Sequence, residues 1–518
     1  MTKTTTTTTA RPAPDGPASP PAVRGPLGLA VSGLMLGMFL AMVDGLIVGP
    51  ALPTIVGELG GVGDLSWVVT AYLLAAAATT PLWGKAGDLF GRKGSYLCAI
   101  GLFLVGSALT GLAQSMGQLI AFRALQGLGA GGLMVGALSI IGVLVPPEQR
   151  GRVQSVSGIM APLAFVGGPL AGGLLTEHLS WRWTFYVNIP LGLIALLIIA
   201  LTVRIRTQRV KARIDHAGIT LLTVAVVALT LVATWGGSRY AWTSAPVLLL
   251  TATALAALAG FVRAERRAAE PVIPPRLFAD RDFTTAQILS FLVGAVMVTL
   301  SSYLPQYLQF VQGSSPTASG LLILPLLFGM LGAQLLIGHL YARARHHRRR
   351  FALLGGALGV LGTALLFLLG PGTPTAAASA LTAVVGAGTG LLMQSSLLIT
   401  TDSAPARDMG AASGTVTLLR TIGGSLGIAL LGALYTGRLH TGLAEQLGAE
   451  NAARLSGPGG ELTPAALHTL PAGTRAALAE SATTGLHGLL TGVLVLALAA
   501  LAASFLLRTT PREARSGA

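Results

Sequence analysis

The chain has 518 residues, of which 52% are hydrophobic and only 10% charged, and its mean hydropathy is +0.71. Soluble domains carry roughly 25% charged residues, so this composition excludes an ordinary soluble enzyme. The single cysteine, Cys98, excludes an internal disulfide, and the absence of a CxxC or Cys/His cluster excludes the common zinc sites.

Long aliphatic stretches indicate an all-α polytopic membrane protein. A helix needs about 20 apolar residues to cross the roughly 30 Å hydrocarbon core of a bilayer. The Thr- and Pro-rich residues 1–27 are expected to be a disordered tail rather than a cleavable signal. Fourteen spans are predicted after it: 28–50, 65–83, 95–113, 118–145, 153–176, 184–203, 216–235, 245–262, 284–310, 318–341, 352–370, 376–400, 411–436 and 486–507.

The basic residues alternate between the loops on the two sides. One set of alternate loops and tails holds 27 of the 34 Lys and Arg residues, and the opposite set holds five. Because cytoplasmic loops of membrane proteins are enriched in Lys and Arg, both termini are predicted to be cytoplasmic. The net charge of +15 is therefore interpreted as a topology signal, with no nucleic-acid partner expected.

An internal repeat predicts two similar halves. The pairs Ser157-Gly158 and Gly167-Gly168 recur as Ser413-Gly414 and Gly423-Gly424, both at an offset of 256 residues. Two parallel repeats are typical of one large transporter class, although chance similarity between glycine-rich helices is the alternative. The predicted organisation is a six-helix bundle over 28–203, two inserted helices within 204–283, a second six-helix bundle over 284–507 with an extracytoplasmic loop at 437–485, and a cytoplasmic tail at 508–518.

Three charged residues fall inside predicted spans, where a charge costs at least about 2.5–3.5 kcal/mol. Asp44 and Arg123 are expected at similar depth in the outer half of the membrane, and Arg420 close to its midplane. Asp44 is interpreted either as a proton carrier beside Arg123 or as half of a permanent structural ion pair. Arg420 is expected either to contact an anion or substrate, or to pack against backbone carbonyls.

Further candidates for the transport path come from helix faces. Gln126 shares a face with Arg123. Tyr303 and Tyr307 form one side of another helix, either as a substrate-contacting wall or as part of an interfacial aromatic belt. Close backbone packing and a kink are expected from Gly168, Pro169, Gly172 and Gly173.

Several of these segments resemble motifs of the major facilitator superfamily, in its fourteen-helix drug:proton antiporter branch. The segments that show this resemblance are the 84–93 loop, the helix containing Arg123-Ala-Leu-Gln126-Gly127, the Gly168-Pro169 segment, Val43-Asp44-Gly, and Trp181-Arg-Trp183 through Asn188-Ile-Pro190. The resemblance implies a role in proton coupling for Asp44 and Arg123. It also implies a cytoplasmic charge latch, expected to consist of Gly84, Asp88, Gly91, Arg92 and Lys93, with Glu148 and Arg150 as further partners.

The expected function is export of an amphipathic small molecule, such as a drug or antibiotic, in exchange for protons. No Walker A motif is present, so ATP is not expected to drive the cycle, and no cofactor or metal is expected. The Arg-rich, Lys-poor composition suggests a bacterial cell membrane, and a monomer in the lipid bilayer is expected. The alternatives are a proton-coupled importer or exporter of an ordinary metabolite and, from other classes, a membrane-embedded enzyme or a receptor.

Overall fold

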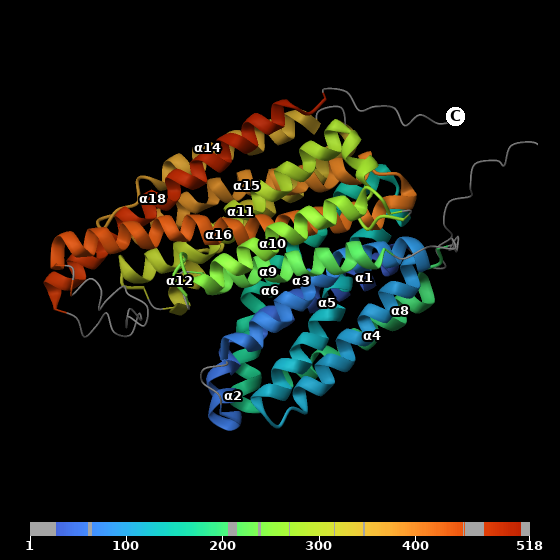
Figure 1. Ribbon diagram of the computed structural model, residues 1–518, viewed down its shortest axis with the longest axis horizontal. Helices are drawn as coiled ribbons and strands as arrows, with labels where there is room; N and C mark the ends of the chain where they lie inside the picture. Colours follow the sequence, from blue (N-terminus) through green and yellow to red (C-terminus); the bar gives the residue numbers. More distant parts are fainter. Residues whose placement is uncertain are drawn as a thin grey trace, which may run out of the picture.

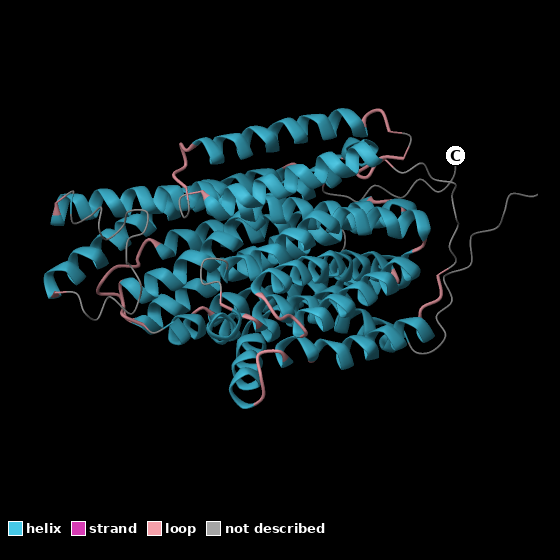
Figure 2. Cartoon of the chain, turned by 60° about the horizontal axis from the view of Figure 1, so that its bottom comes forward, coloured by secondary structure: helices cyan, strands magenta, loops and turns pink. Residues whose placement is uncertain are grey.

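A computed structural model describes residues 27–60, 65–205, 215–236, 240–268, 270–314, 316–344, 348–448, 450 and 471–508. The predicted N-terminal tail and most of the 508–518 tail lie outside these ranges. The secondary structure within them is overwhelmingly helical (Figure 2). Thirteen described helical stretches are long and apolar enough to cross a membrane. The fourteenth predicted span, 153–176, lies within the helix Pro147–His178.

The N-terminal half contains eight α-helices and one 3-10 turn among the described residues. They are α1 (Leu27–Ile47), η1 (Gly49–Ala51), α2 (Leu52–Leu59), α3 (Leu65–Phe90), α4 (Arg92–Gly111), α5 (Met116–Leu144), α6 (Pro147–His178), α7 (Trp183–Tyr186) and α8 (Asn188–Thr202).

The inserted pair and the C-terminal half follow. They contain α9 (His216–Trp235), α10 (Ala245–Glu265), η3 (Pro275–Ala279), α11 (Arg281–Phe310), α12 (Pro316–Leu322), α13 (Leu324–Ala344), α14 (Arg348–Leu366), α15 (Thr375–Ser403), η5 (Ala406–Asp408), α16 (Met409–Leu447) and α18 (Ala472–Phe505).

Several helices extend beyond the predicted spans. The prediction of a loop over the whole of 437–485 was wrong, because α16 continues to Leu447 and α18 begins at Ala472. At 1.5 Å per residue, the 39 residues of α16 span roughly 58 Å, about twice the hydrocarbon thickness. Its last turns are therefore outside the apolar core, where hydropathy does not reveal a helix.

The two halves repeat one pattern of helix pairing. In the first half α1 packs against α6 and α8, and α5 packs against α3 and α4. In the second half α11 packs against α16 and α18, and α15 packs against α13 and α14. This correspondence aligns α6 with α16, which are the helices that carry the Gly-Gly repeat. The predicted two-bundle architecture is thus confirmed.

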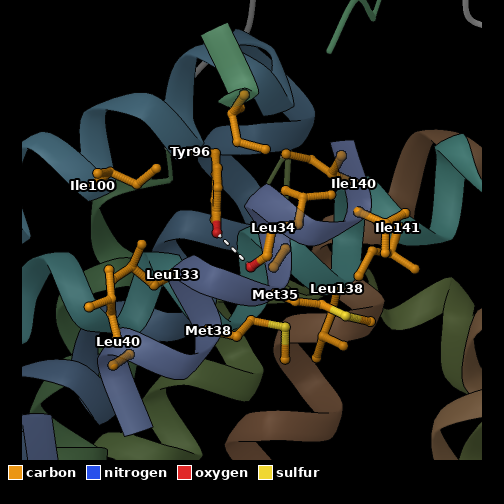
Figure 3. Packing of buried hydrophobic residues seen from close by; sticks show 14 of the residues in the cluster. Leu34, Met35, Met38, Leu40, Tyr96, Ile100, Leu133, Leu138, Ile140 and Ile141 are labelled. Carbon is orange, nitrogen blue, oxygen red and sulfur yellow. Dashed lines mark hydrogen bonds between the residues drawn. The ribbon is translucent and has the colours of Figure 1, made fainter. Parts of the chain in front are cut away.

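The halves meet at one end of the molecule, here called the basic face because Lys85, Arg92, Arg276, Arg348 and Arg508 lie there. A hydrophobic cluster at this end joins α1 and α5 to Leu397 of α15 and Val416 of α16. Figure 3 shows part of it, with Leu34, Met35 and Met38 of α1 packed among side chains of α5. Towards α2 and α12 the two halves diverge (Figure 1), and the clusters there each stay within one half.

The inserted helices α9 and α10 pack against each other and lie across the junction between the halves. Helix α9 contacts both α3 of the first half and α16 of the second. Leu222 and Val226 of α9 share a hydrophobic cluster with Leu418 of α16, and Ala77 of α3 packs against it. The insertion is therefore in contact with both bundles.

Candidate functional site

Asp44 lies near the end of α1, with its side chain fully buried inside the N-terminal half. Its Oδ2 atom is 2.5 Å from Nη1 of Arg123 on α5, and both side chains have no exposed surface. A charge-assisted pair of this kind is shorter and stronger than a neutral hydrogen bond. Two of the three charges that the sequence places inside the membrane thus neutralise each other.

Two amides complete the surroundings of the carboxylate. Nε2 of Gln126 and Nδ2 of Asn188 each donate to Oδ1 of Asp44 at 2.8 Å. Both amides also donate to Oγ of Ser107 on α4, at 3.1 and 3.0 Å, and this hydroxyl donates to the carbonyl of Phe185 at 2.8 Å. The carboxylate therefore has donors from α5 and α8, and Ser107 fixes the orientation of both amides.

Arg123 ties this network to α3. Its Nε donates to the carbonyl of Val68 at 3.2 Å, and the guanidinium stacks over the ring of Tyr72 at 4.1 Å. The Tyr72 hydroxyl in turn donates to the carbonyl of Ala41 on α1 at 2.8 Å. One polar cluster thus links α1, α3, α4, α5 and α8, so a change in the charge of Asp44 acts on most of the N-terminal bundle.

The chemistry available to this cluster is proton exchange. As a carboxylate, Asp44 accepts hydrogen bonds from three side chains; once protonated, it loses its charge and becomes a donor. All five side chains of this cluster are at most 1% exposed, so none of them contacts solvent in this conformation: Asp44, Arg123, Gln126, Ser107 and Asn188.

Sequence reasoning identified Asp44, Arg123 and Gln126 but missed Ser107 and Asn188 as members of the site. Asn188 stands within a recognised motif, Asn188-Ile-Pro190, which was the available signal. The sequence gives no comparable signal for Ser107, because a single serine is common in apolar helices and costs little free energy there.

The predicted latch residues meet at the basic face. Oδ1 of Asp88 accepts from Nη2 of Arg92 at 2.7 Å and from the backbone N–H of Gly410 at 3.0 Å, and Oδ2 accepts from the N–H of Ala411 at 2.9 Å. The Asp88 carboxylate thus satisfies N–H groups at the start of α16, where the helix dipole favours a negative charge. This contact joins the two halves directly.

Two glycines permit the backbone geometry around Asp88. A Cβ at Gly84 would lie 2.5 Å from the carbonyl oxygen of Gly410, so only a residue without a side chain fits. Gly91, at φ 104°, makes the turn between α3 and α4 in a conformation that favours glycine. Lys93 donates from Nζ to the carbonyl of Ala200 at 2.7 Å and holds the end of α8. The side chains of Glu148 and Arg150 lie outside the described residues.

Of the glycines expected to pack closely on α6, two contact α1 and one has no close neighbour. Gly168 and Gly172 face α1, and a Cβ at Gly172 would lie 2.0 Å from the carbonyl oxygen of Ile47. By contrast, a Cβ at Gly173 would have no neighbour within 4 Å, and Pro169 is exposed. Gly173 therefore does not make the close helix contact predicted for it.

The remaining candidates lie in the C-terminal half. Tyr307 is fully buried in the core of that half and donates to the carbonyl of Gly370 at 2.9 Å, so its placement supports neither a wall of the pathway nor an interfacial belt. The Tyr303 ring packs against that of Tyr435 on α16, with 4.9 Å between centroids. Arg420 lies on α16, and its Nε and Nη2 atoms are buried without a hydrogen-bond partner among the described residues.

Comparisons with known proteins agree with this architecture. The family model described as Major Facilitator Superfamily matches residues 34–428. An uncharacterized MFS-type transporter of Mycobacterium tuberculosis is 40% identical over 88% of this chain and 66% of its own length, so the chain spans slightly less than two thirds of that relative. The multidrug transporter protein MdtP of Bacillus subtilis is 36% identical over 81% of this chain and 77% of its own length.

Solved structures share the fold at low sequence identity. The human organic anion transporter MFSD10 superposes with a TM-score of 0.57 at 15% identity, covering 92% of this chain and all of that one. The proton:xylose symporter XylE gives 0.55 at 14% identity, covering 88% of this chain and 98% of that one. The family model over residues 34–428, together with the 36% identical MdtP, shows that the chain belongs to the major facilitator superfamily of membrane transporters.

Proposed function

We propose that this transporter exports amphipathic small molecules, such as drugs or antibiotics, in exchange for protons, and that Asp44 carries the proton. The observation that carries the proposal is the fully buried Asp44 carboxylate, held by one cation and two amides. The names of relatives support export: besides MdtP, multidrug resistance protein 3 of Bacillus subtilis is 34% identical over 78% of this chain and 79% of its own length.

The proposed transport cycle couples the Asp44–Arg123 pair to the contact between the two halves at the basic face. The basic face is taken to be cytoplasmic, in a bacterial plasma membrane. In this conformation Asp88 accepts a hydrogen bond from the start of α16 at that face, and Asp44 pairs with Arg123. Protonation from outside would release Arg123 from the ion pair and loosen the links among α1, α3 and α5. The latch would then open, and substrate from the cytoplasm would displace the proton to the inside.

The test uses inside-out vesicles with an acid interior and a panel of lipophilic antibiotics. The wild type is expected to accumulate at least one compound in a gradient-dependent manner, and Asp44→Asn is expected to lose this uptake. Equal uptake by both proteins would make the Asp44–Arg123 pair structural and refute the coupling role. Uptake that instead requires an acid exterior would indicate symport and refute export.

A further inference from the structure

Arg420 lies within the long helix α16 and, unlike Arg123 and Arg348, forms no ion pair with an acidic residue of the described helices. Arg123 is paired with Asp44, and Arg348 with Asp282. For Arg420, Nε and Nη2 are buried, yet no described group accepts a hydrogen bond from either atom. Arginine cannot shed its proton in a protein, so this charge persists in the membrane and favours an anion beside it.

Helix periodicity places Arg420 on the same face of α16 as residues that contact the N-terminal half, and at Arg420 itself the α16 backbone packs against Gly294 of α11. Met409 contacts Gly142 of α5, and Val416 belongs to the cluster shared with α1 and α5. Met409, Ser413, Val416 and Arg420 recur at spacings of three or four residues and therefore share one face. Arg420 is thus one turn beyond Val416, on the side of the closed junction that points away from the basic face.

Ser413 supplies a second unpaired donor on this face. Its Oγ is buried without a hydrogen-bond partner among the described residues. It precedes Arg420 by two helical turns on the same face, and side chains on a helix lean towards its N-terminus. The acids of the neighbouring helices are engaged elsewhere: Asp88 with Arg92 and α16, and Asp282 with Arg348.

We infer that Arg420 and Ser413 bind the anionic group of the transported molecule, so that substrates are amphipathic carboxylates, sulfonates or phosphates, or zwitterions. This inference rests on the proposed transport function and assigns it a substrate class. The anion would enter from the junction between the halves and pair with a guanidinium whose Nε and Nη2 have no hydrogen-bond partner among the described residues. Exclusion of lipophilic cations follows, because a second positive charge beside Arg420 is repelled.

The test is equilibrium binding by purified full-length protein in detergent, without a pH gradient. Two fluorescent probes with one apolar skeleton are compared: 4-(1-pyrenyl)butyrate and 4-(1-pyrenyl)butyltrimethylammonium. The wild type is expected to bind the anion at least tenfold more tightly than the cation. Arg420→Gln is expected to lose at least tenfold in affinity for the anion, and Arg420→Lys and Ser413→Ala less.

The control is Arg438→Gln, which removes one positive charge from an exposed position of the same helix and should leave both affinities unchanged. Size-exclusion profile and melting temperature establish that each variant is folded. A wild type that prefers the cation, an unchanged affinity in Arg420→Gln, or an equal loss in Arg438→Gln would each overturn the inference. Competition by inorganic phosphate alone at millimolar concentration, with no effect of the pyrenyl skeleton, would show a simple anion site instead.

Because this assay needs no gradient, its failure is separable from failure of the proton-coupling role. Loss of gradient-driven uptake in Asp44→Asn with intact charge selectivity would uphold both proposals. Gradient-driven uptake of cations by the wild type would retain exchange for protons and refute the substrate class alone.

Discussion

At the scale of single residues, the Asp44–Arg123 pair combines a structural and a functional requirement. Removing one partner of a buried ion pair leaves the other charge without compensation, which typically costs about 3–5 kcal/mol. Replacing both partners by neutral groups removes that penalty. The pair can therefore be probed by stability independently of transport.

Arg123→Gln is expected to lower the free energy of unfolding by about 3–5 kcal/mol, because Asp44 would remain buried without a cation. The double variant Asp44→Asn, Arg123→Gln is expected to recover at least half of this loss. Denaturant unfolding in detergent measures both values. A double variant less stable than Arg123→Gln would show that the remaining partners, not the charges, determine the stability of this cluster.

Glu58, outside the membrane spans, gives a pH-dependent contribution to stability. Its carboxylate accepts from Nε1 of Trp181 at 2.6 Å and from Nη1 of Arg182 at 2.5 Å. These hydrogen bonds, Trp181 first, hold the pKa of Glu58 below its ordinary value of 4.5. The contribution is therefore complete above about pH 4.5 and is lost as the pH falls through the lower pKa of the folded state.

Glu58→Gln is expected to lower stability at pH 7 by about 1 kcal/mol or less, because the side chain is partly exposed and screened. The difference in melting temperature between wild type and variant should shrink as the pH is lowered from 7 towards about 3. The exposed Glu445, replaced by Gln, is the control. A difference that grows on acidification would contradict the assignment.

At the scale of helices, the contact between α3 and α16 joins the two halves at the basic face, and we propose that it governs closure of that face. Gly84 and Gly410 bring the two backbones together, and Asp88 then reaches the N–H groups of α16. A methyl group at position 84 would meet a backbone oxygen, which cannot move aside as a flexible side chain does.

Gly84→Ala is accordingly expected to reduce the population with a closed basic face. Spin labels at Arg204→Cys and Arg281→Cys, in a Cys98→Ala background, report the separation of the halves in pulsed electron paramagnetic resonance. Gly94→Ala is the matched control, because a Cβ there has no neighbour within 4 Å. Identical distance distributions for Gly84→Ala and the control would show that this contact does not govern closure.

The segment that connects α10 to α11 forms ion pairs with both halves near the contact between α3 and α16. Nζ of Lys85 lies 3.0 Å from Oε2 of Glu270, and Nη2 of Arg276 lies 2.8 Å from Oδ1 of Asp408. These ion pairs attach the inserted segment to both halves. The segment between α10 and α11 is thus bound to both halves at the basic face.

Lys85→Glu is expected to favour the open basic face through repulsion from Glu270, by about 1 kcal/mol. Adding Glu270→Lys should restore the wild-type distance distribution, because the pair is re-formed with reversed polarity. The same spin labels measure both. If the double variant stays as open as Lys85→Glu, position 85 acts through contacts other than Glu270.

At the scale of the whole molecule, the sequence predicted the two-bundle architecture because bilayer thickness and the repeat constrain the chain strongly. It also predicted that Asp44 and Arg123 share the interior, since charges in a membrane need a partner. It did not reveal that Asn188 and Ser107 belong to the site, because a neutral polar residue in a membrane helix does not require a partner as a charged residue does. Nor did it predict the helical ends of 437–485, where Ala-rich sequence outside the membrane resembles a loop in hydropathy.

The central claim is that Asp44 exchanges its proton when substrate binds. The most direct measurement is proton release from purified protein in weakly buffered detergent, followed with a pH indicator after addition of a compound transported in the vesicle assay. The wild type and Glu58→Gln are expected to release protons, and Asp44→Asn to release none. Release of equal amounts by Asp44→Asn and the wild type would contradict the claim.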